Sequence, residues 1–252
     1  MTNYVELHCH SYYSLLDGAS SIPNLLMQAH QLGMTSLALT DHDNVYGAVS
    51  FQTQAQAFGI KPIFGSEITL ETGHHLALLV QNQQGWENLC YLITQAQHNA
   101  DKGEASLNRD CLIDHTRGLI GLSGCRQGEI PSLVVSQQYD NLSESVDWYM
   151  NVFEQDNFFI ELQNHHHPDD AELVETLVRV ANQHDLAYVA TNNVHYAQQD
   201  QHRLQDILVC IQHNATLDQA SQILRPNSEF YLKSGEEMAQ LFADYPDAIA
   251  NT

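Results

Sequence analysis

The sequence predicts an α/β protein whose parallel strands close into a barrel, and three observations support this prediction. Short apolar runs alternate with longer amphipathic segments along the 252 residues, which is typical of strands joined by helical crossovers. The loop after the first run has Gly18 as its only glycine, whereas the alternative, a doubly wound Rossmann sheet, opens with a glycine-rich phosphate loop. Polar residues follow many of the apolar runs, and functional residues of barrels lie at the C-terminal ends of many strands.

Seven apolar runs are expected to be strands, beginning with YVEL at residues 4–7. Each is four to eight residues long, which suits a strand and is too short for a typical helix. The other six predicted strands are residues 36–40, 63–70, 76–80, 119–122, 158–162 and 187–191.

Seven amphipathic segments between and after these runs are expected to be helices. Ser21 is a candidate cap for the first, and Pro23 falls in its first turn, where a missing N–H costs little. Ser234 and Glu237 match a capping box at the start of the last. The predicted helices are residues 22–32, 45–58, 85–98, 143–154, 169–184, 200–212 and 236–242, and residues 98–108 are expected to form a surface excursion.

The charge balance excludes one class of function. Lys and Arg number 9 and Asp and Glu number 31, which gives a formal net charge of −22. Such a surface repels phosphate backbones, so binding of nucleic acid through a broad basic face is excluded, although bound metals could still attract phosphate. The 15 histidines outnumber the bases. Most are expected to be neutral replacements for Lys and Arg, and a minority at particular positions to be functional.

The five cysteines are odd in number and lack a C-x-x-C spacing, which argues against a disulfide framework and a zinc knuckle. The start, MTNYVELHCH, lacks the features of a signal peptide, and no apolar run approaches the length that spans a membrane. We therefore expect a cytoplasmic protein with no membrane partner.

Residues of metal-ligand type lie at or near the ends of the predicted strands, with Glu67 inside one strand and His75 at the beginning of the next. Because side chains at i and i+2 of a strand share a face, His8 points with His10, and Asn193 points with His195. Each residue alone has an ordinary explanation, such as burial for Cys125. Nine candidates at one rim instead suggest two or three ions sharing carboxylates, since one zinc takes about four ligands. The candidates are His8, His10, Asp17, His42, Glu67, His75, Cys125, Asn193 and His195, with Asp41 and Asp43 beside them as possible helix caps.

Several segments resemble the PHP (polymerase and histidinol phosphatase) domain. They are HCHSYYSLLDGA, LALTDHDNVYGAVSF, KPIFGSEITL, HLALLVQNQQGWENL, GLSGC and ATNNVHY, in the order of that family. The resemblance is to the form found at the N-terminus of bacterial DNA polymerase III alpha subunits. It implies a distorted seven-stranded, TIM-like barrel in one domain over residues 1–252, with residues 230–252 leading into the polymerase of a longer chain.

The resemblance also implies how the ligands are shared between ions. One site takes His8, His10, Glu67 and Asn193, a second takes Glu67, His75 and Cys125, and a third takes Asp17, His42 and His195. His75 is preferred to His74 because the family ligand directly precedes the LALL-like strand. At residue 193 the family has Asp in Asn-Asp-Val-His, and Asn offers a neutral oxygen in its place, so the first site is expected to be weaker.

The function implied is a metal-dependent phosphoesterase, with 3′–5′ exonuclease activity by metal-activated water as the leading interpretation. Zn, Mn or Fe suits the ligand set. Asp41 and His42 are candidates for proton relay and Arg126 for gripping a phosphate, while His165, His166 and His167 are possible substrate contacts or a solvated loop.

A DNA 3′ end or another phosphoester is the expected substrate, and the rest of the polymerase and a proofreading subunit are the expected partners. Two other interpretations stay open. One is an inactive scaffold, suggested by Asn193 and the acidic surface, and the other is a small-molecule phosphatase of the histidinol phosphatase type.

Overall fold

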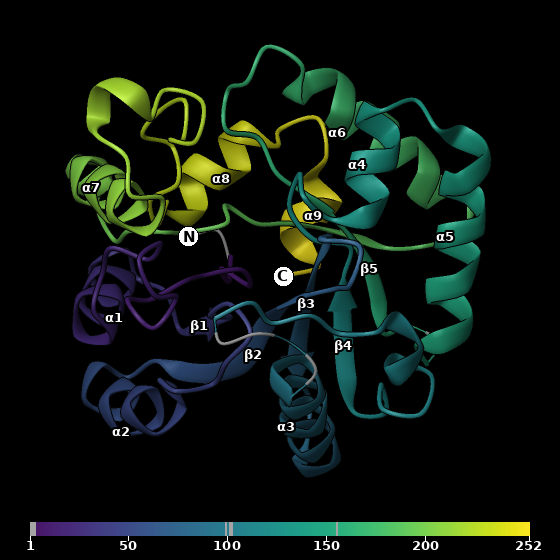
Figure 1. Ribbon diagram of the computed structural model, residues 1–252, viewed down its shortest axis with the longest axis horizontal. Helices are drawn as coiled ribbons and strands as arrows, with labels where there is room; N and C mark the ends of the chain where they lie inside the picture. Colours follow the sequence, from purple (N-terminus) through teal and green to yellow (C-terminus); the bar gives the residue numbers. More distant parts are fainter. Residues whose placement is uncertain (1–3, 99, 101–102, 155) are drawn as a thin grey trace.

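A curled sheet of six strands lies at the centre of the described chain (Figure 1). The computed structural model describes residues 4–98, 100, 103–154 and 156–252. The strands follow one another in sequence order across the sheet. They are β1 (Ser36–Leu39), β2 (Lys61–Thr69), β3 (His75–Val80), β4 (Leu119–Leu122), β5 (Phe158–Leu162) and β6 (Tyr188–Ala190).

The direction of β3 corrects the expectation of a uniformly parallel barrel. β1–β2, β4–β5 and β5–β6 pair in parallel, whereas β3 pairs antiparallel with both β2 and β4. A tight turn through Gly73, at φ +80°, joins β2 directly to β3, so there is no room for the crossover helix that a parallel pair requires. The antiparallel strand brings its first residue, His75, to the edge where its neighbours end.

The run at residues 4–7 is not a strand, so the prediction of seven strands is wrong for the described part of the chain. This segment makes isolated parallel bridges, Glu6 with Leu37 on one side and Cys9 with Val194 on the other. It therefore links β1 to the segment after β6. Side chains take N–H groups that a continuous ladder would need: Val5 N donates to Thr252 Oγ1 (3.1 Å), His8 N to Glu6 Oε1 (2.9 Å) and Cys9 N to Thr40 Oγ1 (2.9 Å).

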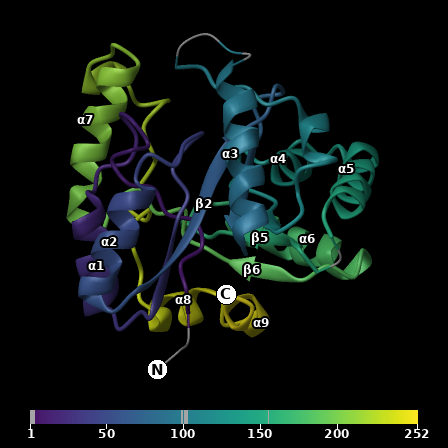
Figure 2. The ribbon, with the colours of Figure 1, turned by 90° about the horizontal axis from the view of Figure 1, so that it is seen from below.

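Helices surround the sheet, with α1, α2 and α7 on one side and α4, α5 and α6 on the other (Figures 1 and 2). The helices are α1 (Ile22–Gln31), α2 (Ala48–Phe58), α3 (Gln83–His98), α4 (Glu129–Val135), α5 (Tyr139–Val152), α6 (Asp170–Gln183), α7 (His202–Gln212), α8 (Gly235–Leu241) and α9 (Pro246–Ala250). Of the part of the chain described, no helix has the length and apolar character needed to cross a bilayer.

The predicted caps are confirmed. Ser21 accepts from Asn24 N at the start of α1, and Ser234 and Glu237 form the capping box of α8. α4 and α9 were not predicted because helices of seven and five residues are too short to show a 3.6-residue period. The predicted surface excursion at residues 98–108 lies partly outside the described residues.

The core has two layers. Most apolar side chains, including Phe51 and Tyr149, fill the space between the sheet and its helices. A smaller cluster gathers side chains from all around the curl. It consists of Leu7, Ala38, Ala77, Leu79, Leu122 and Val189. Because these residues come from the N-terminal segment, β1, β3, β4 and β6 and contact one another, they fill the inside of the curled sheet.

Glu6 holds the N-terminal segment from a fully buried position. Its carboxylate accepts from Tyr4 Oη (2.7 Å), His8 N (2.9 Å) and Asn192 N (3.0 Å). Burial outweighs these hydrogen bonds and raises the pKa of Glu6 from 4.5 to about 7. Between these values the folded state holds a proton that the unfolded chain has lost, so the free energy of unfolding falls as pH rises.

Glu6→Gln should remove this pH dependence. Relative to the unsubstituted chain, the variant should gain up to about 3 kcal/mol of stability between pH 5 and pH 8, since each pKa unit corresponds to about 1.4 kcal/mol. Urea denaturation at both pH values with chelator present measures the change. Exposed Glu144→Gln is the control. Equal pH dependence in Glu6→Gln and the unsubstituted chain would contradict the assignment.

Candidate metal centre

The inner face of the sheet changes from apolar to polar towards one rim. Side chains alternate along a strand, so the face that carries Ala77 and Leu79 in β3 also carries His75. On β5 the same alternation takes Phe159 to Glu161. The layer above the apolar cluster thus consists of buried ionisable groups, and the antiparallel β3 contributes to it through its first residue.

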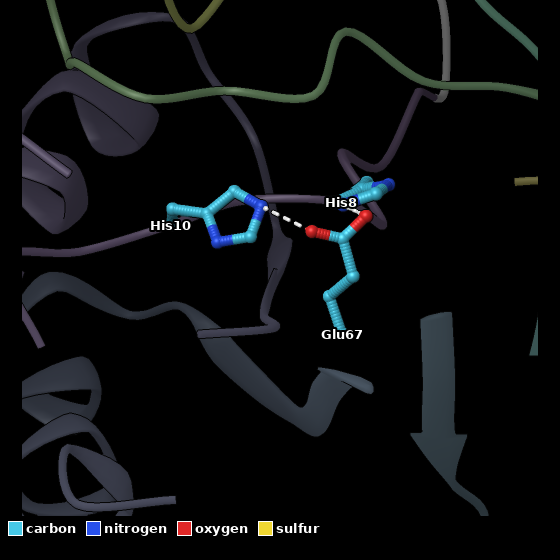
Figure 3. A group of neighbouring side chains, drawn as sticks. All are labelled: His8, His10 and Glu67. Atoms are coloured by element: carbon cyan, nitrogen blue, oxygen red, sulfur yellow. Dashed lines mark ion pairs between the residues drawn. The ribbon is translucent and has the colours of Figure 1, made fainter. Parts of the chain in front are cut away.

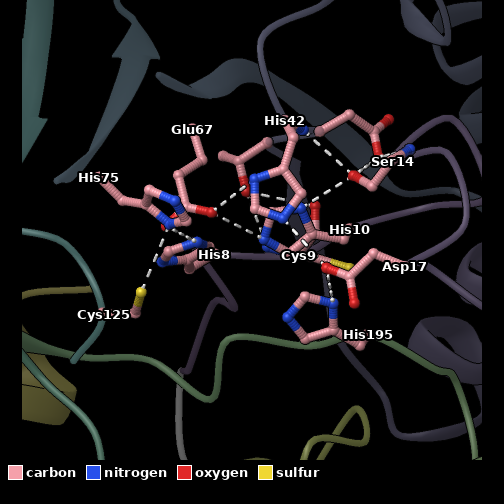
Figure 4. Close-up of polar contacts among 12 residues, drawn as sticks. His8, Cys9, His10, Ser14, Asp17, His42, Glu67, His75, Cys125 and His195 are labelled. Carbon is pink, nitrogen blue, oxygen red and sulfur yellow. Dashed lines mark hydrogen bonds and ion pairs between the residues drawn. The ribbon is translucent and has the colours of Figure 1, made fainter. Parts of the chain in front are cut away.

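Glu67, near the end of β2, lies at the centre of this polar layer and is 1% exposed. Four imidazoles from three other segments surround its carboxylate (Figure 4), and Figure 3 shows two of them, His8 and His10. The distances are 3.3 Å from His8 Nε2 to Oε1, 3.5 Å from His10 Nε2 to Oε2, 2.9 Å from His42 Nδ1 to Oε2 and 3.2 Å from His75 Nδ1 to Oε1. Two groups have ligand atoms close enough to share an ion: His8, His10 and Glu67, and His42, Glu67 and His75.

The far nitrogens of His8 and His10 are held by partners behind them. His8 Nδ1 donates to Glu161 Oε1 at 2.6 Å. His10 Nδ1 donates to Ser14 Oγ at 2.9 Å, because the single hydroxyl proton of Ser14 is given to Asp41 Oδ1 (2.7 Å). Both imidazoles therefore present an unprotonated Nε2 to the centre when they are neutral, which is how histidine ligands are oriented around metals.

Asp41 and Asp43 do not cap α2, whose cap residue Gly47 has no side-chain cap bond. The Asp41 carboxylate accepts from both N–H and hydroxyl groups of Ser11 and Ser14, at 2.7–3.1 Å. Asp43 accepts from the backbone and hydroxyl of Thr69 at the end of β2. Both carboxylates thus fix the loops that carry His10 and His42, and Asp43 also ties its loop to the end of β2, the strand that carries Glu67.

Asp17 forms a second focus beside Glu67. Its Oδ2 lies 3.1 Å from His42 Nε2 and 3.2 Å from His195 Nδ1 (Figure 4). His42 therefore stands between the two carboxylates, with one nitrogen towards each. Gln205 of α7 donates to Asp17 Oδ1 (2.9 Å), and Arg225 Nη2 lies 3.4 Å from the same oxygen.

Cys125 and Asn193 complete the predicted set. Cys125 Sγ lies 3.8 Å from His75 Nδ1, the same nitrogen that faces Glu67. Asn193 is buried, with a left-handed backbone (φ +42°) that Asn tolerates better than most residues, and it borders the same cavity as His195. His74 is turned away, with Nε2 against Ser132 Oγ at 3.0 Å, so the structure brings His75 into the cluster.

Protons now balance the charge of the cluster. Burial opposes ionisation of Glu67, but His75, His8 and His42 hold its pKa well below the usual range. For His42 the carboxylates of Glu67 and Asp17 outweigh burial and raise its pKa to about 10. Burial and Arg225 lower the pKa of His195 to about 4. Divalent ions would replace protons on these imidazoles, so metal binding would release protons.

The donor set fits divalent ions. Several ligand atoms are buried and lack a hydrogen-bond partner among the described residues, which is uncommon unless an ion or water completes them. Those atoms are His8 Nε2, His10 Nε2, Glu67 Oε1, Asn193 Oδ1 and His195 Nδ1. Imidazole, carboxylate and thiol groups together match the ligands of zinc and neighbouring transition metals.

A cavity of about 340 Å³ opens above these residues. Arg126, predicted to grip a phosphate, borders it but is already bonded to Asp169 and Asp170 (2.7 and 2.8 Å). His165 and His167 also border the cavity, whereas His166 is exposed and turned towards solvent.

Two residues of the site were missed in the sequence. Glu161 could have been found from the alternation on β5, since Phe159 and Glu161 share a face, but an isolated Glu in a strand usually faces solvent. Arg225 gave no signal, because it lies in an irregular segment with no periodic pattern.

The chain was compared with known proteins. The family model of the PHP domain matches residues 6–165. A DNA polymerase III subunit alpha from Treponema pallidum is 37% identical over 99% of this chain and 23% of its own length. An error-prone DNA polymerase from Symbiobacterium thermophilum is 38% identical over 99% of this chain and 24% of its own length. The chain thus spans about a quarter of these curated relatives.

Solved structures resemble the fold. A protein from Bifidobacterium adolescentis assigned as a metal-dependent phosphoesterase has a TM-score of 0.53 and 16% identity, over 76% of this chain and 87% of its own. The lesion-specific endonuclease of Pyrococcus furiosus has a TM-score of 0.51 and 16% identity, over 77% and 49%. At this identity the likeness concerns the fold alone.

Glu161→Gln should weaken metal binding by about 10–100-fold. Without the Glu161 carboxylate behind it, the His8 imidazole is less basic and its orientation is less well fixed. Titration calorimetry with Zn²⁺ measures the affinity. Glu175→Gln on the exposed face of α6 is the matched control and should bind as the unsubstituted chain does. Equal affinity in both variants would show that Glu161 does not support His8.

Proposed function

The chain belongs to the PHP domain family, and from this premise we propose that it hydrolyses phosphodiester bonds at a divalent metal centre, with the 3′ end of DNA as its substrate. The observation that carries the proposal is the buried Glu67 carboxylate among four imidazoles, two of which, His8 and His10, are buried with Nε2 atoms that lack hydrogen-bond partners in the described chain. Such a cluster is costly to bury unless cations complete it.

Two or three ions of Zn, Mn or Fe would be held. His8, His10, Glu67 and Asn193 would hold one, Glu67, His75 and Cys125 a second, and Asp17, His42 and His195 a third. When bound, such ions lower the pKa of water and neutralise phosphoryl oxygens, which is the chemistry that phosphoester hydrolysis needs.

Other residues of the chain would orient the metal ligands and hold protons and charge beside them. Glu161 and Ser14 hold His8 and His10 with Nε2 towards Glu67, and Asp41 in turn holds Ser14. His42, with one nitrogen towards each carboxylate, is placed to hold or pass a proton between Asp17 and Glu67. Arg225 borders the cavity and supplies positive charge for a phosphate, whereas the charge of Arg126 is balanced by Asp169 and Asp170.

DNA is favoured as substrate for two reasons. The relatives that match across nearly the whole chain are DNA polymerases. The net charge of −22 opposes binding of a long duplex along the surface, whereas a single end can enter the cavity above the ligands. In this proposal the domain trims 3′ ends beside the remainder of a polymerase chain and a proofreading subunit.

Removal of Glu67 tests the nuclease proposal. With Mn²⁺ or Zn²⁺ the chain should release mononucleotides from single-stranded DNA labelled at its 5′ end. Glu67→Gln should reduce the rate more than about 100-fold, a larger loss than a residue behind a ligand would give. Gel analysis of the label gives the rate, with Glu144→Gln as the control.

Three results would separate the alternatives. Mononucleotide release supports the exonuclease. Turnover of a small phosphate monoester without attack on DNA would instead support a small-molecule phosphatase. Folded protein that binds metal yet cleaves neither substrate would favour the scaffold interpretation.

The scaffold has one specific observation in its favour, the neutral Asn193 at a ligand position. Asn193→Asp should therefore raise the affinity of the first site for Mn²⁺ about tenfold, since a carboxylate is a stronger ligand for a hard cation than an amide oxygen. It should also raise hydrolysis at limiting metal.

Calorimetry with Mn²⁺ measures this gain. Asn214→Asp is a close control, because Asn214 shares the left-handed backbone (φ +49°) but is exposed outside the centre. An unchanged affinity in Asn193→Asp would remove residue 193 from the ligand set.

A further inference from the structure

Arg225 reaches into the metal centre from the segment between α7 and α8. Its Nη2 donates a short hydrogen bond to His195 Nε2 and lies 3.4 and 3.5 Å from the two oxygens of Asp17. Its guanidinium carbon stacks 4.5 Å from the centre of the Phe230 ring. A permanent cation thus contacts two of the three residues, Asp17 and His195, to which the resemblance assigns the third ion.

The hydrogen bond fixes the proton of His195. A guanidinium has donors and no acceptor, so His195 Nε2 must offer a lone pair to Arg225. The proton of the neutral imidazole then sits on Nδ1, which points to Asp17 Oδ2 at 3.2 Å. In this arrangement neither nitrogen of His195 has a free lone pair, because Nε2 accepts from Arg225 and Nδ1 carries the proton.

An ion bound to His195 would displace Arg225 whichever nitrogen it used. At Nε2 the ion would take the lone pair that now accepts from Arg225. At Nδ1 the proton would have to move to Nε2, where it would face the N–H group of Arg225, so that two donors would oppose each other. Coulomb repulsion between the guanidinium and a divalent ion a few ångströms away adds to the conflict.

We propose that Arg225 and a third divalent ion are alternative occupants of the Asp17–His195 pair, so that two ions are resident and Arg225 supplies the third positive charge. The proposal rests on the metal centre of the proposed function and goes beyond it by fixing the number of resident ions. A displaced Arg225 stays at the cavity wall, because Phe230 holds its guanidinium face.

The test counts ions on the full chain. Equilibrium dialysis against graded free Mn²⁺, followed by elemental analysis, should give two tight ions and a weak third in the unsubstituted protein. Arg225→Met removes the charge and the donors while keeping an apolar stem, and should tighten the third ion about tenfold, which is about 1.4 kcal/mol. Arg225→Lys keeps the charge, so the third ion should stay weak.

Arg203→Met is the matched control, since Arg203 is exposed on α7 away from the centre and the charge change is the same. It should leave all three affinities unchanged. Melting of each metal-free variant verifies that the chain is folded before ions are counted.

Three results would overturn the proposal while leaving the metal centre in place. The first is a third ion equally weak in Arg225→Met and the unsubstituted chain. The second is equal tightening in Arg225→Met and Arg225→Lys, because charge would then not be the cause. The third is three tight ions in the unsubstituted protein. Absence of any bound Mn²⁺ would overturn the metal centre as well, whereas two tight ions with an unaltered third would overturn the role of Arg225 alone.

Discussion

A single buried carboxylate organises this molecule. Glu67 lies within 2.9–3.5 Å of four imidazoles that belong to the N-terminal segment, the loop after β1 and the start of β3. A carboxylate in such a position is stable only while cations or protons surround it, so each of these segments must reach the same point. The curled sheet, the reversed β3 and the N-terminal segment that links β1 to the end of β6 all satisfy this requirement.

The support of the centre extends outward in two directions. Below it, the apolar cluster of the sheet interior excludes water and sets the parity of each strand, so that Glu67, His75 and Glu161 face inward together. Behind it, the hydrogen bonds that His8 Nδ1 donates to Glu161 and His10 Nδ1 donates to Ser14 fix which nitrogen of each imidazole faces the centre. The apolar cluster therefore determines which side chains face the centre, and Glu161 and Ser14 determine where the protons of His8 and His10 lie. Glu161 and Ser14 are as buried as the apolar cluster.

Much of this arrangement could be predicted from local patterns. The bounds of β4 and β5, the caps at Ser21 and Ser234 and the convergence of His8, His10 and Glu67 follow from apolar runs and side-chain alternation. His75, at the start of its strand, joins them because β3 is antiparallel. The direction of β3 could not be predicted, since a strand has the same pattern either way. Residues 4–7 have the hydropathy of a strand, but hydropathy does not register the side chains that take the N–H groups of Val5, His8 and Cys9. Arg225 reaches the centre only through tertiary structure.

The small number of Lys and Arg residues affects where an anion can bind to this chain. With 9 Lys and Arg against 31 acids, the surface has little to attract a phosphate. Within the cavity, positive charge is supplied by the protonated His42, by Arg225 and, under the proposed function, by divalent ions. Because Arg225 and a third ion compete for Asp17 and His195, the charge of the cavity depends on which of the two is bound there and not only on the residues that line it. Under the proposed function, an anionic substrate would then be drawn to this cavity and repelled from the acidic surface.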